Sequence, residues 1–142
     1  MEYVKFPSSV EVVSYDSAGV LSNTETDAIV LDDDDSIAET VKAPANTQAT
    51  LYINFTKGSL TNAIIRFYGS PLKNATDWYQ ETQEVDSNGT ATLYPFNITL
   101  TADTKAIYNF PIDAVRSYKI TVQGTGTTTG SRIKLSLGLR NN

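Results

Sequence analysis

Hydrophobic and polar residues alternate with a period of two over most of the chain. The alternation is strongest between Ser117 and Leu139, where the arms Ser117–Gly124 and Ser131–Leu139 flank a loop of Thr and Gly. This period is typical of strands with one buried and one solvated face, and the loop composition suits turns. We therefore expect a closing hairpin of two paired strands.

The two arms divide their residues between two faces. The residues expected in the core are Tyr118, Ile120, Val122, Ile133, Leu135 and Leu137. The residues expected on the solvated face are Lys119, Thr121, Gln123, Arg132 and Lys134. The solvated face is therefore predicted to be a basic strip.

Shorter alternating runs precede this hairpin at spacings of about 8–12 residues, and no long helical period interrupts them. The expected strands are Val10–Tyr15, Ala28–Leu31, Ile37–Lys42, Thr50–Thr56, Asn62–Gly69, Trp78–Val85, Thr90–Leu100 and Lys105–Ile112. Many short strands of this kind predict an all-β protein, namely a single antiparallel β-sandwich, jelly-roll-like or Ig-like, of about eight to ten strands. We expect residues 10–142 to form this one domain and residues 1–9 to be a flexible N-terminal arm.

Two local signals lie between the expected strands Trp78–Val85 and Thr90–Leu100. Asp86-Ser87-Asn88-Gly89 predicts a tight turn. The apolar phase then changes around Tyr94-Pro95, which indicates a bulge or an edge position, because proline cannot donate a hydrogen bond to a sheet.

Composition narrows the possible chemistry. The 142 residues include no cysteine and no histidine, which excludes disulfides and the commonest general base and metal ligand. A net charge of −5 disfavours nucleic acid as a partner. No apolar run has membrane-spanning length, and no secretory signal is recognisable at the start, so we expect synthesis in the cytoplasm.

Enzymatic motifs are also missing from the sequence. There is no phosphate loop, nucleophile elbow or dinucleotide fingerprint, and nothing in the sequence brings two carboxylates together for hydrolysis. We therefore expect a protein that is not an enzyme and that needs no cofactor.

The acidic run Asp32, Asp33, Asp34 and Asp35 is the most visible charge feature. Its oxygens could bind a hard cation such as calcium. A run of like charges between strands is more commonly a solvated loop, so we predict no metal site. We also consider that this loop meets the basic strip of a neighbouring subunit.

Trp78 is the only tryptophan. With Tyr52, Tyr68, Tyr79 and Tyr94 it could form an aromatic platform for sugar rings. We favour the alternative that Trp78 caps the core at one end of a hairpin, as large aromatic side chains often do.

Two segments carry a family resemblance. RFYGSPLKNATDWYQE (Arg66–Glu81) and AVRSYKITVQGTGTTTGSRIKLSLGLRNN (Ala114–Asn142) resemble hairpins of small β-sandwich virion proteins from tailed bacteriophages. The resemblance covers roughly the C-terminal half of the chain. It implies a non-enzymatic structural component of a virion.

Together these features lead to one functional hypothesis. We expect a virion protein that decorates or cements a phage capsid through protein–protein contacts, with the major capsid protein or tail and neck proteins as partners, and that forms a trimer or a ring. The expected contact residues are Tyr3, Phe6, Tyr52, Ile64, Tyr68, Lys119, Arg132 and Lys134. The alternatives are a neck or tail component, or a carbohydrate-binding sandwich that uses Trp78 and nearby tyrosines.

Overall fold

A computed structural model describes residues 11–32, 47–72, 75–112, 115 and 117–141. These residues form strands joined by turns and loops, and none of them is helical. No segment of this part of the chain is therefore a helix that is long and apolar enough to cross a membrane. The expected arm, the expected strand Ile37–Lys42 and residues Asp33 to Asp35 lie outside the described residues.

Eleven strands are defined in the described ranges. They are β1 (Glu11–Asp16), β2 (Thr26–Asp32), β3 (Thr47–Thr56), β4 (Leu60–Ser70), β5 (Tyr79–Gln80), β6 (Thr82–Ser87), β7 (Thr90–Pro95), β8 (Asn97–Leu100), β9 (Thr104–Ile112), β10 (Ser117–Gly126) and β11 (Arg132–Asn141). Sheet A has the order β1-β11-β3-β9, and sheet B has the order β2-β10-β4-β5, with β8 also paired to β4. Strands β6 and β7 form a separate two-stranded ribbon.

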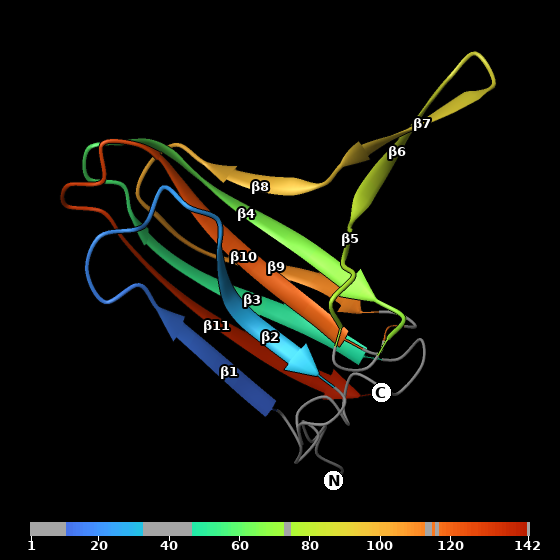
Figure 1. Cartoon of the computed structure of the whole chain (residues 1–142), viewed down its shortest axis with the longest axis horizontal. Helices are drawn as coiled ribbons and strands as arrows, with labels where there is room; N and C mark the ends of the chain where they lie inside the picture. Colours follow the sequence, from blue (N-terminus) through green and yellow to red (C-terminus); the bar gives the residue numbers. More distant parts are fainter. Residues whose placement is uncertain (1–10, 33–46, 73–74, 113–114, 116, 142) are drawn as a thin grey trace, which may run out of the picture.

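The two sheets face each other as the layers of a sandwich (Figure 1). Strands β5 and β8 share one edge of β4, so together they occupy the position of a single edge strand. Sheets A and B then each have four strand positions, and the chain crosses between them after β1, β2, β3, β8, β9 and β10. This is the eight-position arrangement of a jelly roll. The predicted all-β antiparallel sandwich is confirmed.

The prediction that the last two strands pair with each other as a hairpin is wrong. β10 pairs with β2 and β4 in sheet B, whereas β11 pairs with β1 and β3 in sheet A. The Thr-Gly loop therefore carries the chain from one layer to the other. The predicted core faces of both arms are nevertheless buried, because a period of two sets which face is buried but does not choose the hydrogen-bonding partner.

The core between the sheets is aliphatic with one aromatic cluster. Phe67 from sheet B lies within 5.3–6.0 Å of Phe96, Tyr108 and Phe110, measured between ring centroids. Tyr118 extends this cluster through Phe110, at 6.2 Å. Offset and tilted ring pairs of this kind add to the stabilisation that burial provides. The cluster lies beside the edge that β5 and β8 share.

Candidate interaction surface

The β6–β7 hairpin leaves the body of the sandwich at the edge of sheet B. The chain departs after β5, turns, and returns to the same edge of β4 as β8. In Figure 1 the hairpin extends away from both sheets. Every residue of β6 and β7 is exposed, so the hairpin contributes nothing to the core and is free to act as a contact element.

The local sequence explains why this segment is a hairpin. Asn88 and Gly89 have φ values of 53° and 79°, the left-handed conformations that a two-residue type I′ loop needs and that Asn-Gly provides. The predicted tight turn is therefore confirmed. The change of phase around Tyr94-Pro95 marks the place where the chain stops pairing with β6 and begins to pair with β4.

The hairpin has two faces of different character. Leu93 lies opposite Glu84, and Ala91 lies opposite Asp86, so one face combines apolar and acidic side chains. We call Glu84, Asp86, Ala91 and Leu93 the acidic hairpin face. The other face carries Val85 and Tyr94 among threonine, serine and glutamine. Leu93 is 64% exposed, the largest value among the large hydrophobic side chains described as exposed.

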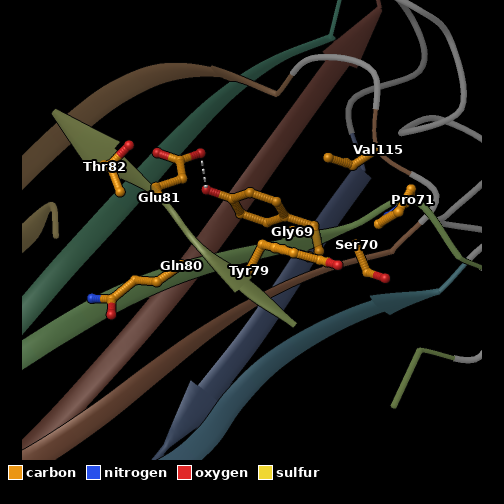
Figure 2. A pocket seen from close by; sticks show the side chains of 9 residues that line it. Gly69, Ser70, Pro71, Tyr79, Gln80, Glu81, Thr82 and Val115 are labelled. Atoms are coloured by element: carbon orange, nitrogen blue, oxygen red, sulfur yellow. Dashed lines mark hydrogen bonds between the residues drawn. The ribbon is translucent and has the colours of Figure 1, made fainter. Parts of the chain in front are cut away.

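Glu81 anchors the base of the hairpin. Its backbone N–H donates to the carbonyl of Phe67, and its carbonyl accepts from the N–H of Phe96, both at 2.8 Å. Its carboxylate accepts a 3.0 Å hydrogen bond from the hydroxyl of Tyr118, as the dashed line in Figure 2 shows. Burial, together with the negative charge of Glu81, holds the pKa of Tyr118 far above its ordinary value.

A cavity of about 460 Å³ lies beside this anchor. Glu81 and Thr82 line one part of it and Pro71 and Val115 another (Figure 2). Among the residues that the structure describes, Glu81 is the only carboxylate that lines it, whereas carboxylate hydrolysis needs a pair.

The outer face of sheet A carries a second exposed apolar site. Tyr52 and Ile107 lie directly opposite each other and are 53% and 59% exposed. One row along the strands, Asn54 lies opposite both Lys105 and Lys134. An open depression of about 490 Å³ includes all five of these residues in its lining. We call Tyr52, Lys105, Ile107 and Lys134 the basic sheet face.

Arg132 at the start of β11 is engaged within its own chain. Its guanidinium donates to both carboxylate oxygens of Asp16, at 3.0 and 2.7 Å. This pair of hydrogen bonds lowers the pKa of Asp16 to about 2 and raises that of Arg132. Arg132 is therefore a poorer candidate for a contact than its exposure suggests.

The predicted basic strip does not exist as one surface. Lys119 belongs to sheet B, while Arg132 and Lys134 belong to sheet A, so they lie on opposite layers of the sandwich. Thr121, predicted to be solvated, is buried. It lies next to a bulge in β10 and donates a 2.8 Å hydrogen bond to Glu25. The prediction of a basic strip was wrong because the two arms, β10 and β11, belong to different sheets.

Trp78 does not belong to the core cluster, so the prediction that it caps the core is wrong. Its side chain is half-buried, and the ammonium of Lys119 lies 4.8 Å from its ring centroid and 5.3 Å from that of Tyr68. Lys119 also pairs with Asp27 at 3.2 Å. These cation–π contacts occupy part of the aromatic surface that a sugar would use.

The neighbouring charges of sheet B are satisfied internally. Glu25 accepts hydrogen bonds from Tyr68 and Thr121 and pairs with Arg66 at 3.3 Å. Burial opposes ionisation of Glu25, but these partners outweigh it and lower its pKa. Burial and the bond to Glu25 raise the pKa of Tyr68 to about 12. This network ties the segment before β2 to the outer face of sheet B.

The predicted contact residues are thus distributed over both layers. Tyr52 and Lys134 lie together on sheet A, whereas Ile64, Tyr68 and Lys119 lie on sheet B. Tyr3 and Phe6 lie outside the described residues.

The sequence analysis did not identify the acidic hairpin face as a contact surface, although the tight turn and the phase change were both visible in the sequence. No cluster of three or more potential metal ligands occurs in the described ranges, and Asp33 to Asp35 fall outside them.

No protein-family model matches the chain, and no curated protein matches it. The chain is similar to several solved structures, among them the following two. The first is from work titled "Bacillus endospore appendages form a novel family of disulfide-linked pili", with a TM-score of 0.52, 16% identity, and coverage of 94% of this chain and 87% of the other. The second is the SPBc2 prophage-derived protein YomS, with a TM-score of 0.46, 12% identity, and coverage of 96% and 100%. The first likeness shows a shared fold.

Proposed function

We propose that this chain is a non-enzymatic structural protein that assembles through protein–protein contacts, as a decorating or cementing subunit of a phage capsid. The observation that carries the proposal is the β6–β7 hairpin. It exposes Val85, Leu93 and Tyr94 on an element without a role in the core. Aromatic and large apolar side chains on a projecting element are what interfaces use.

Two further observations support an assembled particle. Jelly rolls are common in viral capsid domains, and the segments Arg66–Glu81 and Ala114–Asn142 resemble those of small virion proteins. The fold is also shared with a protein of Bacillus endospore appendages, which are disulfide-linked pili. Because this chain has no cysteine, its contacts in an assembly would involve no disulfide bonds.

The test uses a chain whose hairpin is shortened. Residues 83–94 are replaced by Asn-Gly, which joins Thr82 to Pro95, a pair that already lies opposite in the hairpin. We expect the jelly roll to fold as before, because every removed residue is exposed. Phage particles are purified on a density gradient from a culture that produces the chain. The number of copies of the chain per particle is then measured by quantitative mass spectrometry.

The full chain is expected at a fixed copy number per particle, and the shortened chain is expected to be lost from the particles. The variant Leu72→Asp, at a residue that is 54% exposed and does not belong to the hairpin, is the control and is expected to be incorporated. If the full chain remains in the particle-free fractions, the proposed function is wrong.

Carbohydrate binding is a second candidate, favoured by the position of Trp78 outside the core beside Tyr68 and Lys119. Jelly rolls also occur in lectins. On a glycan array, binding that is lost in Trp78→Ala with the fold intact would support this function. No binding by the unaltered chain would remove it.

A further inference from the structure

We infer that the acidic hairpin face of one copy docks on the basic sheet face of a second copy of this chain. The inference rests on the proposed structural function and names one of the partners. Both surfaces combine an exposed apolar centre with a pair of like charges, and the charges are of opposite sign. Such complementarity selects partners and sets their register.

On the hairpin, Leu93 forms the apolar centre and Glu84 lies directly across from it. Asp86 follows two residues later on the same face, toward the turn. Neither carboxylate has an ion-pair or hydrogen-bond partner among the residues that the structure describes. Their charges are therefore available to a partner.

On sheet A, Tyr52 and Ile107 form the apolar centre, and the two lysines lie in the adjacent row. Lys105 has no ion-pair partner within the described ranges. Lys134 lies opposite Asp16 and its charge helps to lower the pKa of that carboxyl, but no ion pair joins the two, and both carboxylate oxygens bind Arg132. An apolar centre with two ammonium groups beside it thus remains open, on a protein whose net charge is −5.

The spacing of the two surfaces agrees. Successive residues on one strand face are about 7 Å apart, and directly opposite residues are about 5 Å apart. If Leu93 lies over Tyr52 and Ile107, the row containing Asp86 can therefore lie over the row containing Lys105 and Lys134, and Glu84, in the row of Leu93, lies one row (about 7 Å) from those lysines. The depression on sheet A gives the leucine side chain a place to enter.

The hairpin's own sheet A is not a suitable partner. The hairpin leaves from the edge of sheet B and extends away from the sandwich (Figure 1), whereas the basic sheet face is the outer surface of the other layer. The contact must therefore join two chains. Because it uses two different surfaces, it is heterologous and produces a ring if it closes and a filament if it does not.

The first experiment is sedimentation velocity of the purified full chain over a range of concentrations. We expect concentration-dependent species larger than a monomer. Leu93→Asp and Ile107→Asp should each weaken association by at least about tenfold, because each places a carboxylate in an apolar contact. Leu72→Asp is the matched control and should associate like the unaltered chain. A chain that stays monomeric throughout overturns the inference.

The second experiment exchanges the charges. One variant carries Glu84→Lys and Asp86→Lys, and the other carries Lys105→Glu and Lys134→Glu. Each alone should fail to associate, since like charges would meet. An equal mixture should associate again, because each hairpin then meets a sheet face of opposite charge. A mixture that stays monomeric overturns the inference, as does association of either variant alone.

These outcomes are separate from those of the proposed function. If the chain is monomeric in solution but its hairpin is still required for incorporation into particles, the hairpin binds a different protein. The inference is then wrong and the proposed function stands. If the chain is absent from particles but the charge exchange restores association, the self-contact stands and the proposed function is wrong.

Discussion

The hydroxyl of Tyr118 in the core donates a 3.0 Å hydrogen bond to the carboxylate of Glu81, at the residue where the edge of sheet B gives way to the projecting hairpin. Tyr118 is 1% exposed. The bond therefore connects the most buried part of sheet B to the base of the most exposed element. A contact element gains precision when its base is held by a rigid core.

Tyr118→Phe should destabilise the protein by about 1–3 kcal/mol, because a partly buried hydrogen bond to a charged group is lost while the ring packing is kept. Denaturant unfolding measures the change. Tyr52→Phe, at an exposed tyrosine, is the control and should have little effect. Equal unfolding midpoints for the two variants would contradict the role of the Tyr118–Glu81 bond.

Stability should also fall at alkaline pH. Burial and the charge of Glu81 raise the pKa of Tyr118 above the ordinary value of 10.0, so only the unfolded chain releases this proton as the pH rises through 10. The contribution of Tyr118 to the free energy of unfolding is complete below pH 10 and declines above it. Unfolding free energies measured on both sides of pH 10 should show a smaller decline in Tyr118→Phe. An identical decline would exclude Tyr118 as a cause.

At acid pH the Asp16–Arg132 pair should be visible by NMR. The carboxyl of Asp16 should titrate at about 2 instead of its ordinary 3.8, because Arg132 hydrogen-bonds the ionised form. The stabilisation from this pair is present above pH 3.8 and is lost as the pH falls toward 2. Arg132→Gln should raise the pKa of Asp16 toward 3.8, and Arg140→Gln should leave it unchanged. An unaltered pKa in Arg132→Gln would disprove the assignment.

Two glycines of positive φ should respond differently to alanine. A Cβ on Gly58 (φ +55°) would lie 2.4 Å from the carbonyl carbon of Gly130, whereas a Cβ on Gly89 (φ +79°) would meet nothing within 4 Å. Gly89→Ala should therefore cost only the backbone strain, about 1–2 kcal/mol. Gly58→Ala should cost roughly 1–3 kcal/mol more, because two turns must move apart. Thermal unfolding of the pair measures the difference, and equal costs would refute the clash.

Trp78 and Phe67 should separate a surface aromatic side chain from a core one. Phe67→Ala should cost about 3–5 kcal/mol, because this side chain is fully buried among three aromatic rings. Trp78→Ala should cost about 0.5–2 kcal/mol, the scale of a partly desolvated cation–π contact with Lys119. Chemical unfolding compares them. A cost for Trp78→Ala as large as that for Phe67→Ala would place Trp78 in the core after all.

Strand positions and buried faces were predictable because they depend on local alternation. Leu51, Ile53 and Phe55 in β3, and Ala63, Ile65 and Phe67 in β4, are buried as their spacing predicts. The turn at Asn88-Gly89 was predictable for the same reason, since its conformation depends on two adjacent residues. The sequence therefore predicted an antiparallel sandwich but did not identify which strands pair with each other.

Part of the contact surface was predictable and part was not. Tyr52 was expected to point outward, and it does. Its partner Ile107 and the lysines beside it become neighbours only because β9, β3 and β11 pair across long sequence separations. Trp78 was placed in the core because its size favours burial, but it lies at the surface of sheet B, where the ammonium of Lys119 contacts its ring.

By itself, the sequence of this protein determined where most of the described strands lie, which faces of β3, β4 and β11 enter the core and where one tight turn lies, because these properties follow from spacing over a few residues. Only the tertiary structure decided that β10 and β11 belong to different sheets, that Lys119 and Lys134 therefore lie on opposite layers, and that residues 82–95 project as a hairpin. The reason is physical. Alternation specifies a face, whereas the hydrogen-bonding partner of a strand depends on the packing of the whole chain.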